Sequence, residues 1–230
     1  MTILQKLLPF GIPYALYVAV PALAPAWIDP WIVQAARFAA VAAALAAYRR
    51  HYAGCFRVDA RAALHAAWMT PLAAAAWILP CWAIAEFRGA AAEPFPQGTA
   101  YAALRMANSV LLAAAAEELL FRGHVQPWMR HALDKAKREK CGFVKAAVTA
   151  LDDSPADFAT PATSWTCALP AAILFALGHT PAEYIPALLY YAATAWLFRM
   201  TRSIGACFIV HALVNAIVGA LALAGMRFLW

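Results

Sequence analysis

The sequence predicts an all-α, polytopic membrane protein, and its composition and the arrangement of its apolar segments carry this prediction. Of the 230 residues, 65% are hydrophobic and 13% are charged, whereas soluble domains carry about 45–50% apolar and about 25% charged residues. A soluble globule of this size cannot bury so much apolar surface. The composition therefore excludes a soluble enzyme, a disordered chain and a nucleic-acid-binding protein. The five cysteines show no ligand-like spacing and imply no disulfide framework.

Apolar stretches close to the length of a membrane span recur along the whole chain. A hydrocarbon core of about 30 Å needs roughly 20 helical residues. We expect seven spans, within a range of six to eight, in a single integral membrane domain over residues 1–230. The predicted spans are Leu7–Ala26, Pro30–Tyr48, Ala62–Ala85, Ala100–Phe121, Trp165–His179, Ala182–Phe198 and Ile204–Ala224.

Basic residues between the spans predict the orientation. They gather after the second span, after the fourth span and after the sixth span, at Arg49, Arg50, Arg57, Arg61, Arg130, Lys135, Lys137, Arg138, Lys140, Lys145, Arg199 and Arg202. Basic loops stay on the cytoplasmic side, so we expect a cytoplasmic N-terminus. Residues 123–164 are then a cytoplasmic loop with an amphipathic helix on the membrane surface, or alternatively a gate or substrate-docking element.

Two neighbouring carboxylates close the fourth span, where an ionisable residue is costly and functional by default. Neighbours on a helix point about 100° apart, so Glu117 and Glu118 cannot share one role. Glu118 and Arg122 lie four residues apart and form a favourable pair on one face. Glu117 then remains free to face the interior as a general base. A surface ion pair at a helix end would explain Glu118 and Arg122 but leaves Glu117 unexplained.

Two histidine-containing patterns follow at the same four-residue spacing. Phe175 and His179 end the short fifth span, and His211 and Asn215 lie inside the seventh. A histidine at a helix end can be structural, and a His–Asn pair can serve as an interhelical hydrogen bond. Together with Glu117, however, the patterns supply a base, two histidines and an amide. This set suits activation of water and stabilisation of an oxyanion.

The ordered patterns EExxxR, FxxxH and HxxxN resemble the CPBP family of glutamic-type intramembrane proteases, which includes type II CAAX prenyl endopeptidases and bacteriocin-processing or immunity proteins. The motifs lie within residues 111–216. The resemblance implies that Glu117 and His179 activate the catalytic water and that His211 and Asn215 hold the oxyanion. Glu118 and Arg122 match supporting positions. It also implies a protein or peptide substrate, cleaved near its C-terminus, and no cofactor.

A narrower likeness concerns the stretch from Asp157-Phe158 to Trp165 and the opening spans with Tyr48-Arg49-Arg50. These segments resemble a subgroup associated with exosortase-type sorting systems, which implies a bacterial inner-membrane enzyme acting on C-terminal sorting signals. Three alternatives stay open. Glu117, His179 and His211 could ligate zinc in a metalloprotease. The chain could instead be a non-proteolytic immunity or scaffold protein, or a small transporter, although it shows no internal repeats.

Overall fold

The computed structural model describes residues 2–89, 98–153 and 163–226, and this part of the chain is helical with no strands. The all-α class is therefore confirmed. The α-helices are α1 (Ile3–Leu23), α2 (Pro30–Ala47), α3 (Ala60–Arg88), α4 (Gly98–Ala107), α5 (Ala114–Leu120), α6 (Gln126–Glu139), α7 (Phe143–Ala150), α8 (Trp165–Leu177), α9 (Tyr184–Thr201) and α10 (Ile204–Leu223).

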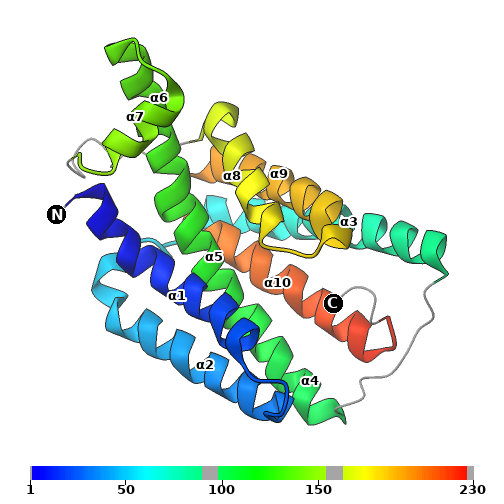
Figure 1. The fold of residues 1–230 in the computed structure, drawn as a ribbon. Coiled ribbons are helices and arrows are strands. Elements are labelled where there is room, and N and C mark those ends of the chain that lie inside the picture. Colours follow the sequence, from blue (N-terminus) through cyan, green and yellow to red (C-terminus); the bar gives the residue numbers. More distant parts are fainter. Residues whose placement is uncertain (1, 90–97, 154–162, 227–230) are drawn as a thin grey trace.

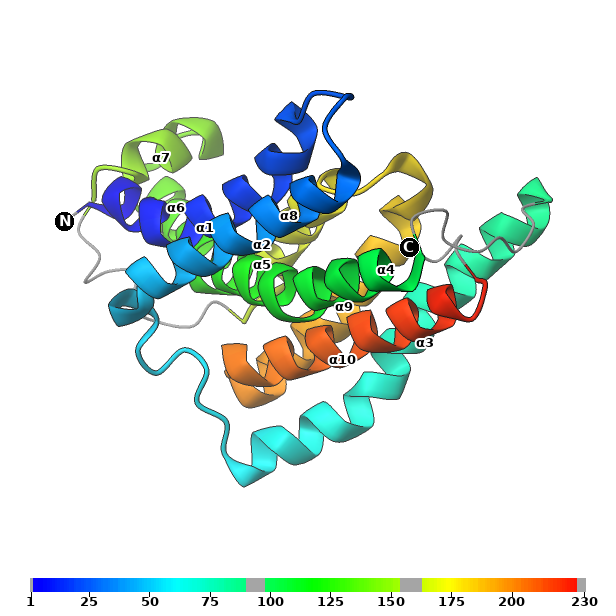
Figure 2. The same ribbon diagram turned by 90° about the horizontal axis from the view of Figure 1, so that it is seen from below.

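The helices pack around a central rod formed by α4, α5 and α6 (Figures 1 and 2). The antiparallel pair α1 and α2 contacts one side of this rod, and α10 contacts another. Helix α3 packs along α9 and α10, while α8 packs against α9 and α6. The largest buried apolar cluster lies where α3, α8, α9 and α10 meet, around side chains such as Met69, Phe175 and Val210. The rod therefore stands between two helical layers and contacts both.

Four of the described helices are long and apolar enough to cross a membrane, namely α1, α2, α3 and α10. Helix α8 is apolar but has only 13 residues, which at ~1.5 Å per residue covers about 20 Å. The membrane location of the fold is thus supported. The count of seven spans and the cytoplasmic N-terminus stay predictions.

The central rod runs without a break from Gly98 to Glu139, because π-helical turns at Asn108–Ala113 and Phe121–Val125 join α4, α5 and α6. The structure differs here from the loop expected to begin at Gly123. This glycine does not end the helix. A Cβ atom at Gly123 would come within 2.7 Å of the Phe10 ring, so the glycine allows α1 to approach the rod closely.

Helices α6 and α7 form a hairpin at one end of the bundle (Figure 1). Asp153 joins them, since His131 Nε2 lies 2.7 Å and Lys135 Nζ 2.9 Å from its carboxylate. Burial alone raises the pKa of the Asp153 carboxyl, but the hydrogen bonds from Lys135 and His131 outweigh burial and hold that pKa below its usual range. The backbone N–H of Ile3 also donates to the Asp153 carbonyl, at 3.1 Å, which ties α1 to the hairpin. The Asp157-Phe158 pair of the expected exosortase likeness lies outside the described residues.

Candidate active site

The predicted ion pair between Glu118 and Arg122 is present and fully buried, with Glu118 0% exposed. The guanidinium of Arg122 also donates to the Thr194 hydroxyl on α9, at 2.6 Å, and lies 4.7 Å above the centre of the Tyr191 ring. The other carboxylate oxygen of Glu118 accepts a hydrogen bond from His211 Nδ1 at 3.0 Å. A charged group is costly to bury without partners, and these contacts supply them. Glu118 and Arg122 therefore hold α5, α9 and α10 in one arrangement.

His211 stands between the two neighbouring carboxylates. With Nδ1–H donated to Glu118, the other ring nitrogen, Nε2, faces the Oε2 atom of Glu117 at 3.7 Å. This orientation follows from a contact between residues 93 positions apart, so spacing along the sequence does not reveal it. Among the described histidines, His211 therefore approaches Glu117 through Nε2, while its Nδ1 is hydrogen-bonded to Glu118.

Glu117 is 8% exposed and projects from α5 toward a cavity. None of the described residues donates a hydrogen bond to its Oε2 atom. A buried carboxylate oxygen normally accepts hydrogen bonds. Glu117 is therefore positioned to accept a proton or a hydrogen bond from a molecule that enters the cavity.

His179 follows the C-terminal end of α8, where the chain turns toward α9. The carbonyl of Phe175 accepts a hydrogen bond from its Nδ1 at 2.9 Å, and the two rings lie 4.7 Å apart. Phe175 and His179 are therefore in contact at their four-residue spacing, but α8 ends at Leu177 and not at His179 as expected for the fifth span. Because a carbonyl can only accept, Nδ1 carries the hydrogen and Nε2 of a neutral ring holds the lone pair. The ring of Trp77 on α3 packs against the imidazole at 5.4 Å.

Asn215 lies one turn after His211 on α10. Its side-chain amide donates to the Ser109 carbonyl at 2.8 Å, inside the first π-helical turn of the rod. Turns of this kind occur frequently at functional sites. The contact fixes the amide beside the rod and leaves a second amide hydrogen and the Oδ1 atom for other partners.

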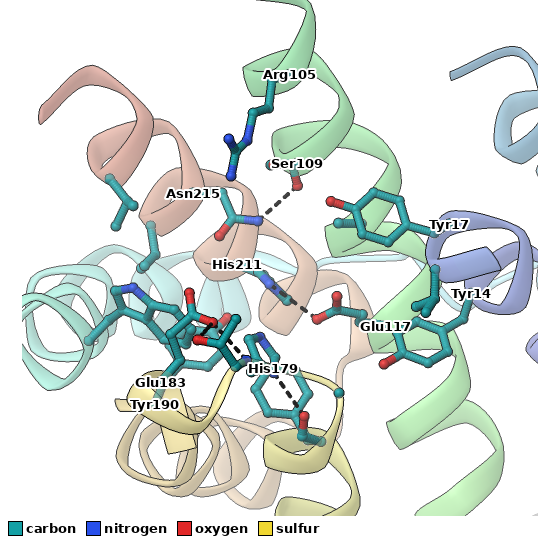
Figure 3. A pocket seen from close by; sticks show the side chains of 18 of the residues that line it. Tyr14, Tyr17, Arg105, Ser109, Glu117, His179, Glu183, Tyr190, His211 and Asn215 are labelled. Carbon is teal, nitrogen blue, oxygen red and sulfur yellow. Dashed lines mark hydrogen bonds and ion pairs between the residues drawn. The ribbon is translucent and has the colours of Figure 1, made fainter. Parts of the chain in front are cut away.

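The four residues predicted to be catalytic line one cavity of about 490 Å³. Figure 3 shows Glu117 projecting from α5, His211 and Asn215 from α10, and His179 from the turn after α8, all toward the same space. The volume lies within the usual range for ligand pockets of ~300–1,000 Å³. The cavity can therefore hold a short peptide segment together with water.

Sequence reasoning missed several polar residues of this cavity. They are Tyr14 and Tyr17 of α1, Arg37 of α2, Arg105 of α4, Glu183 and Tyr190. A usable signal existed for two of them, because Arg37 and Arg105 are charged residues inside predicted spans. Tyr190 is 2% exposed and its ring lies 5.2 Å from that of His211. A tyrosine within a predicted span gives no sequence signal that it lies in a functional cavity.

Glu117, His179 and His211 do not form a ready-made metal site. Among the residues that the structure describes, no group of three or more His, Cys, Asp or Glu side chains is arranged to hold a metal ion. His211 also directs Nδ1 at Glu118, and His179 directs Nδ1 at a backbone carbonyl. Only the Nε2 atom of each ring is therefore left for a further partner.

Comparison with known families identifies the region that carries the cavity residues. The model of the type II CAAX prenyl endopeptidase Rce1-like family matches residues 99–217, slightly more than half of the chain. The chain belongs to this family. No match was found to a curated protein or to a solved structure.

The Rce1-like match covers Glu117, His179, His211 and Asn215, together with Arg105, whereas α1 and α2 lie outside it. The family is one of membrane proteases, so the match and the apolar helices together describe an integral membrane protein of the peptidase class. Helices α1 and α2 nevertheless contribute Tyr14, Tyr17 and Arg37 to the cavity wall. This chain therefore closes its Rce1-like site with residues from outside the matched region.

Proposed function

We propose that this protein is a glutamic-type intramembrane endopeptidase that cleaves a membrane-associated protein or peptide near its C-terminus. The observation that supports this most strongly is the position of Glu117, which lines the same cavity as His179, His211 and Asn215 and has no described hydrogen-bond donor at its Oε2 atom. Membership of the Rce1-like family supports the same reaction class.

In the proposed reaction, Glu117 removes a proton from a water molecule as the water oxygen attacks the scissile carbonyl carbon. Nε2 of His179 assists as a second acceptor, because Nδ1 is already donated to Phe175. The C–N bond then breaks, and the proton taken by Glu117 passes to the leaving amine. General acid–base catalysis of this kind typically contributes about 10²–10⁴ in rate.

His211 and Asn215 are proposed to donate hydrogen bonds to the oxyanion that forms in this reaction. The fixed Asn215 amide, held 2.8 Å from the Ser109 carbonyl, keeps one further N–H. His211 acts through Nε2 when its ring is protonated, with Glu118 holding Nδ1 at 3.0 Å. Removing one oxyanion donor typically lowers kcat by about 10²–10³, which is the loss we expect for Asn215→Ala.

We further propose that the substrates are C-terminal sorting signals of exported proteins and that the enzyme resides in a bacterial inner membrane with its N-terminus in the cytoplasm. The distribution of basic residues between the predicted spans supports the orientation. Membrane lipid is then a permanent partner, and nucleic acid is not.

The direct test expresses an exported protein with a C-terminal membrane-anchoring tail beside the wild-type chain, Glu117→Gln or Glu86→Gln. Glu86 is an exposed carboxylate near the end of α3 and serves as the matched control. We expect loss of the tail, measured by mass spectrometry, with wild type and Glu86→Gln only. Equal processing by Glu117→Gln would remove Glu117 from the chemistry.

Two alternatives have distinct signatures in the same assay. A zinc protease would lose activity with a chelator and regain it with added zinc, whereas the proposed mechanism is indifferent to both. A scaffold or immunity protein would give the same result for wild type and Glu117→Gln in every processing assay, while still retaining a bound partner.

A further inference from the structure

The cavity is lined by a second carboxylate that the proposed reaction does not use. Glu183 ends the short 3-10 turn η5 (Pro181–Glu183), which follows His179 and leads into α9. It lines the same cavity as Glu117. Figure 3 shows its side chain well apart from that of Arg105. A carboxylate is rarely withdrawn from water unless it has a partner, so Glu183 marks this end of the cavity as a candidate binding site.

One oxygen of the Glu183 carboxylate is engaged and the other is not. Oε2 accepts hydrogen bonds from the Thr180 hydroxyl at 2.7 Å and from the Thr180 N–H at 2.9 Å. Among the described residues, none donates to Oε1 and no cation pairs with the carboxylate. Because Thr180 is neutral and adjoins His179, its two bonds hold the carboxylate next to His179 and leave the negative charge uncompensated.

Capping of the turn does not by itself require this charge. The two bonds between Thr180 and Glu183 form a capping box, a motif in which glutamine serves as well as glutamate. A glutamine at this position would accept the same hydrogen bonds. The charge of Glu183 is therefore an additional property of the cavity, and it is available to a ligand.

Aromatic rings form the cavity wall near this turn. The Trp77 ring of α3 lies 5.4 Å from the ring of His179 and 6.1 Å from that of Tyr190. Trp77 and Tyr190 line the cavity together with Glu183, and η5 contacts both α3 and α9, the helices that carry these two rings. An aromatic face attracts an organic cation through the ring quadrupole. A carboxylate beside such faces therefore favours a positively charged group.

The size of the cavity determines which part of a substrate could reach Glu183. A compact cavity of about 490 Å³ is about 10 Å across, which is roughly three residues of extended peptide at ~3.3–3.6 Å per residue. Glu117 and His179, which act on the scissile bond in the proposed reaction, line the same space. A side chain that reaches Glu183 thus belongs to a residue close to that bond. Lysine and arginine carry their cation on a long, flexible stem.

We propose that Glu183, with Trp77 and Tyr190, binds a lysine or arginine side chain of the substrate within about three residues of the scissile bond. This inference rests on the proposed function, because its ligand is part of the peptide that is cleaved. The ammonium or guanidinium group donates to Oε1 of Glu183 and lies against the aromatic wall. Glu183 then determines specificity, since it selects substrates with a positive charge beside the cleaved bond, while Glu117 acts as the base.

The test uses the full-length protein in dodecyl maltoside, a detergent without ammonium groups, and matched pairs of fluorescent, amide-capped peptides. Each peptide joins an apolar anchor to a short uncharged stretch. One scanned position of this stretch is lysine in one member of a pair and norleucine, which lacks the amine, in the other. Binding is measured by anisotropy in the Glu117→Gln background, which prevents cleavage and removes the other carboxylate that the structure places in the cavity. For the best pair, we expect lysine to bind about 10- to 100-fold more tightly, the range for a hydrogen bond to a charged group.

Three variants assign this preference to Glu183. Glu183→Gln keeps an acceptor for Thr180 but removes the charge, so it should abolish the preference while the norleucine peptide binds as before. Trp77→Leu should keep part of the preference, because the carboxylate remains. Glu86→Gln removes an exposed carboxylate of α3 that does not line the cavity, and it should leave the preference unchanged.

Equal affinity within every pair, no binding of any peptide, or a preference that survives Glu183→Gln would overturn the cation site. Loss of norleucine binding in Glu183→Gln would overturn it as well, because the residue would then only support the fold. A preference that added phosphatidylethanolamine erases would assign Glu183 to a lipid ammonium group instead. Cleavage by the chain with Glu117 intact is scored separately. An intact preference without cleavage would defeat the protease proposal alone, and cleavage without a preference would defeat this one alone.

Discussion

Replacing Arg122 by methionine should destabilise the protein strongly, because it leaves the buried carboxylate of Glu118 without its ion-pair partner. Methionine has a similar length but cannot pair with Glu118, donate to Thr194 or stack on Tyr191. Glu118 is 0% exposed and would keep only the hydrogen bond from His211. Breaking a buried pair in this way costs about 3–5 kcal/mol. At ~2–4 °C per kcal/mol for a chain of this size, the melting temperature should fall by about 6–20 °C.

The structure supplies both the assay and its control. Cys81, Cys167 and Cys207 are buried, whereas Cys55 and Cys141 are partly exposed. With Cys55 and Cys141 replaced by serine in every variant, a thiol-reactive fluorophore reports unfolding in detergent. The control is Arg130→Met, since Arg130 forms the same i,i+4 pair with Asp134 but both side chains are about half exposed. An exposed pair contributes about 0–1 kcal/mol, and the control should melt within about 4 °C of wild type.

The reasoning fails if Arg122→Met melts as the control does. A second variant separates the stranded charge from lost packing. Adding Glu118→Gln to Arg122→Met removes the uncompensated carboxylate, and the double variant should melt above Arg122→Met alone. Because Glu118 also orients His211, the double variant should regain stability without regaining peptidase activity.

Two further predictions concern other parts of the fold. A Cβ atom at Gly178 would collide with the Tyr14 hydroxyl. Gly178→Ala should therefore lower peptidase activity about tenfold. Adding Tyr14→Phe to Gly178→Ala should restore much of this activity, because residues in contact are energetically coupled. Asp153 has a pKa below its usual range when folded, so its contribution to the α6–α7 hairpin is present above pH ~4, the unfolded value, and is lost as pH falls through the lower folded value. The measurement is hydrogen exchange of the α7 amides, corrected for intrinsic rates. In wild type, protection should fall below pH ~4, whereas in Asp153→Asn it should already be low at neutral pH. A fall of the same size in the variant would contradict this prediction.

Helical spacing and the cost of burying charge led the sequence reasoning to four residues that line one cavity in the structure. The four-residue spacing correctly paired Glu118 with Arg122 and Phe175 with His179. Both pairs are local, since each joins residues only four positions apart, although His179 lies just beyond the end of α8. The orientation of His211 was not predictable in this way, because it depends on a contact with Glu118 across 93 positions.

The roles of Gly123 and Arg37 also depend on contacts between residues far apart in the sequence. Gly123 suggests a helix end in the sequence, but in the fold it admits Phe10 from α1, and only the packed structure distinguishes the two roles. Arg37 obeys the rule that singled out Glu117, since both are charged residues inside predicted spans. Its significance emerges only when α2 is placed beside α4 by the Gln34–Asn108 contact.

The unbroken helix from Gly98 to Glu139 has a mechanical consequence. At ~1.5 Å per residue it is roughly 60 Å long. Arg105 lies near one end, Glu117 near the middle and the α6–α7 hairpin at the other end. The π-helical turns lie on either side of the Glu117 segment, where a hydrogen-bond ladder of different pitch bends most readily. Because the Phe121–Val125 turn lies between α6 and Glu117, we expect a tilt of the α6–α7 hairpin to bend the rod at that turn, next to the buried carboxylates.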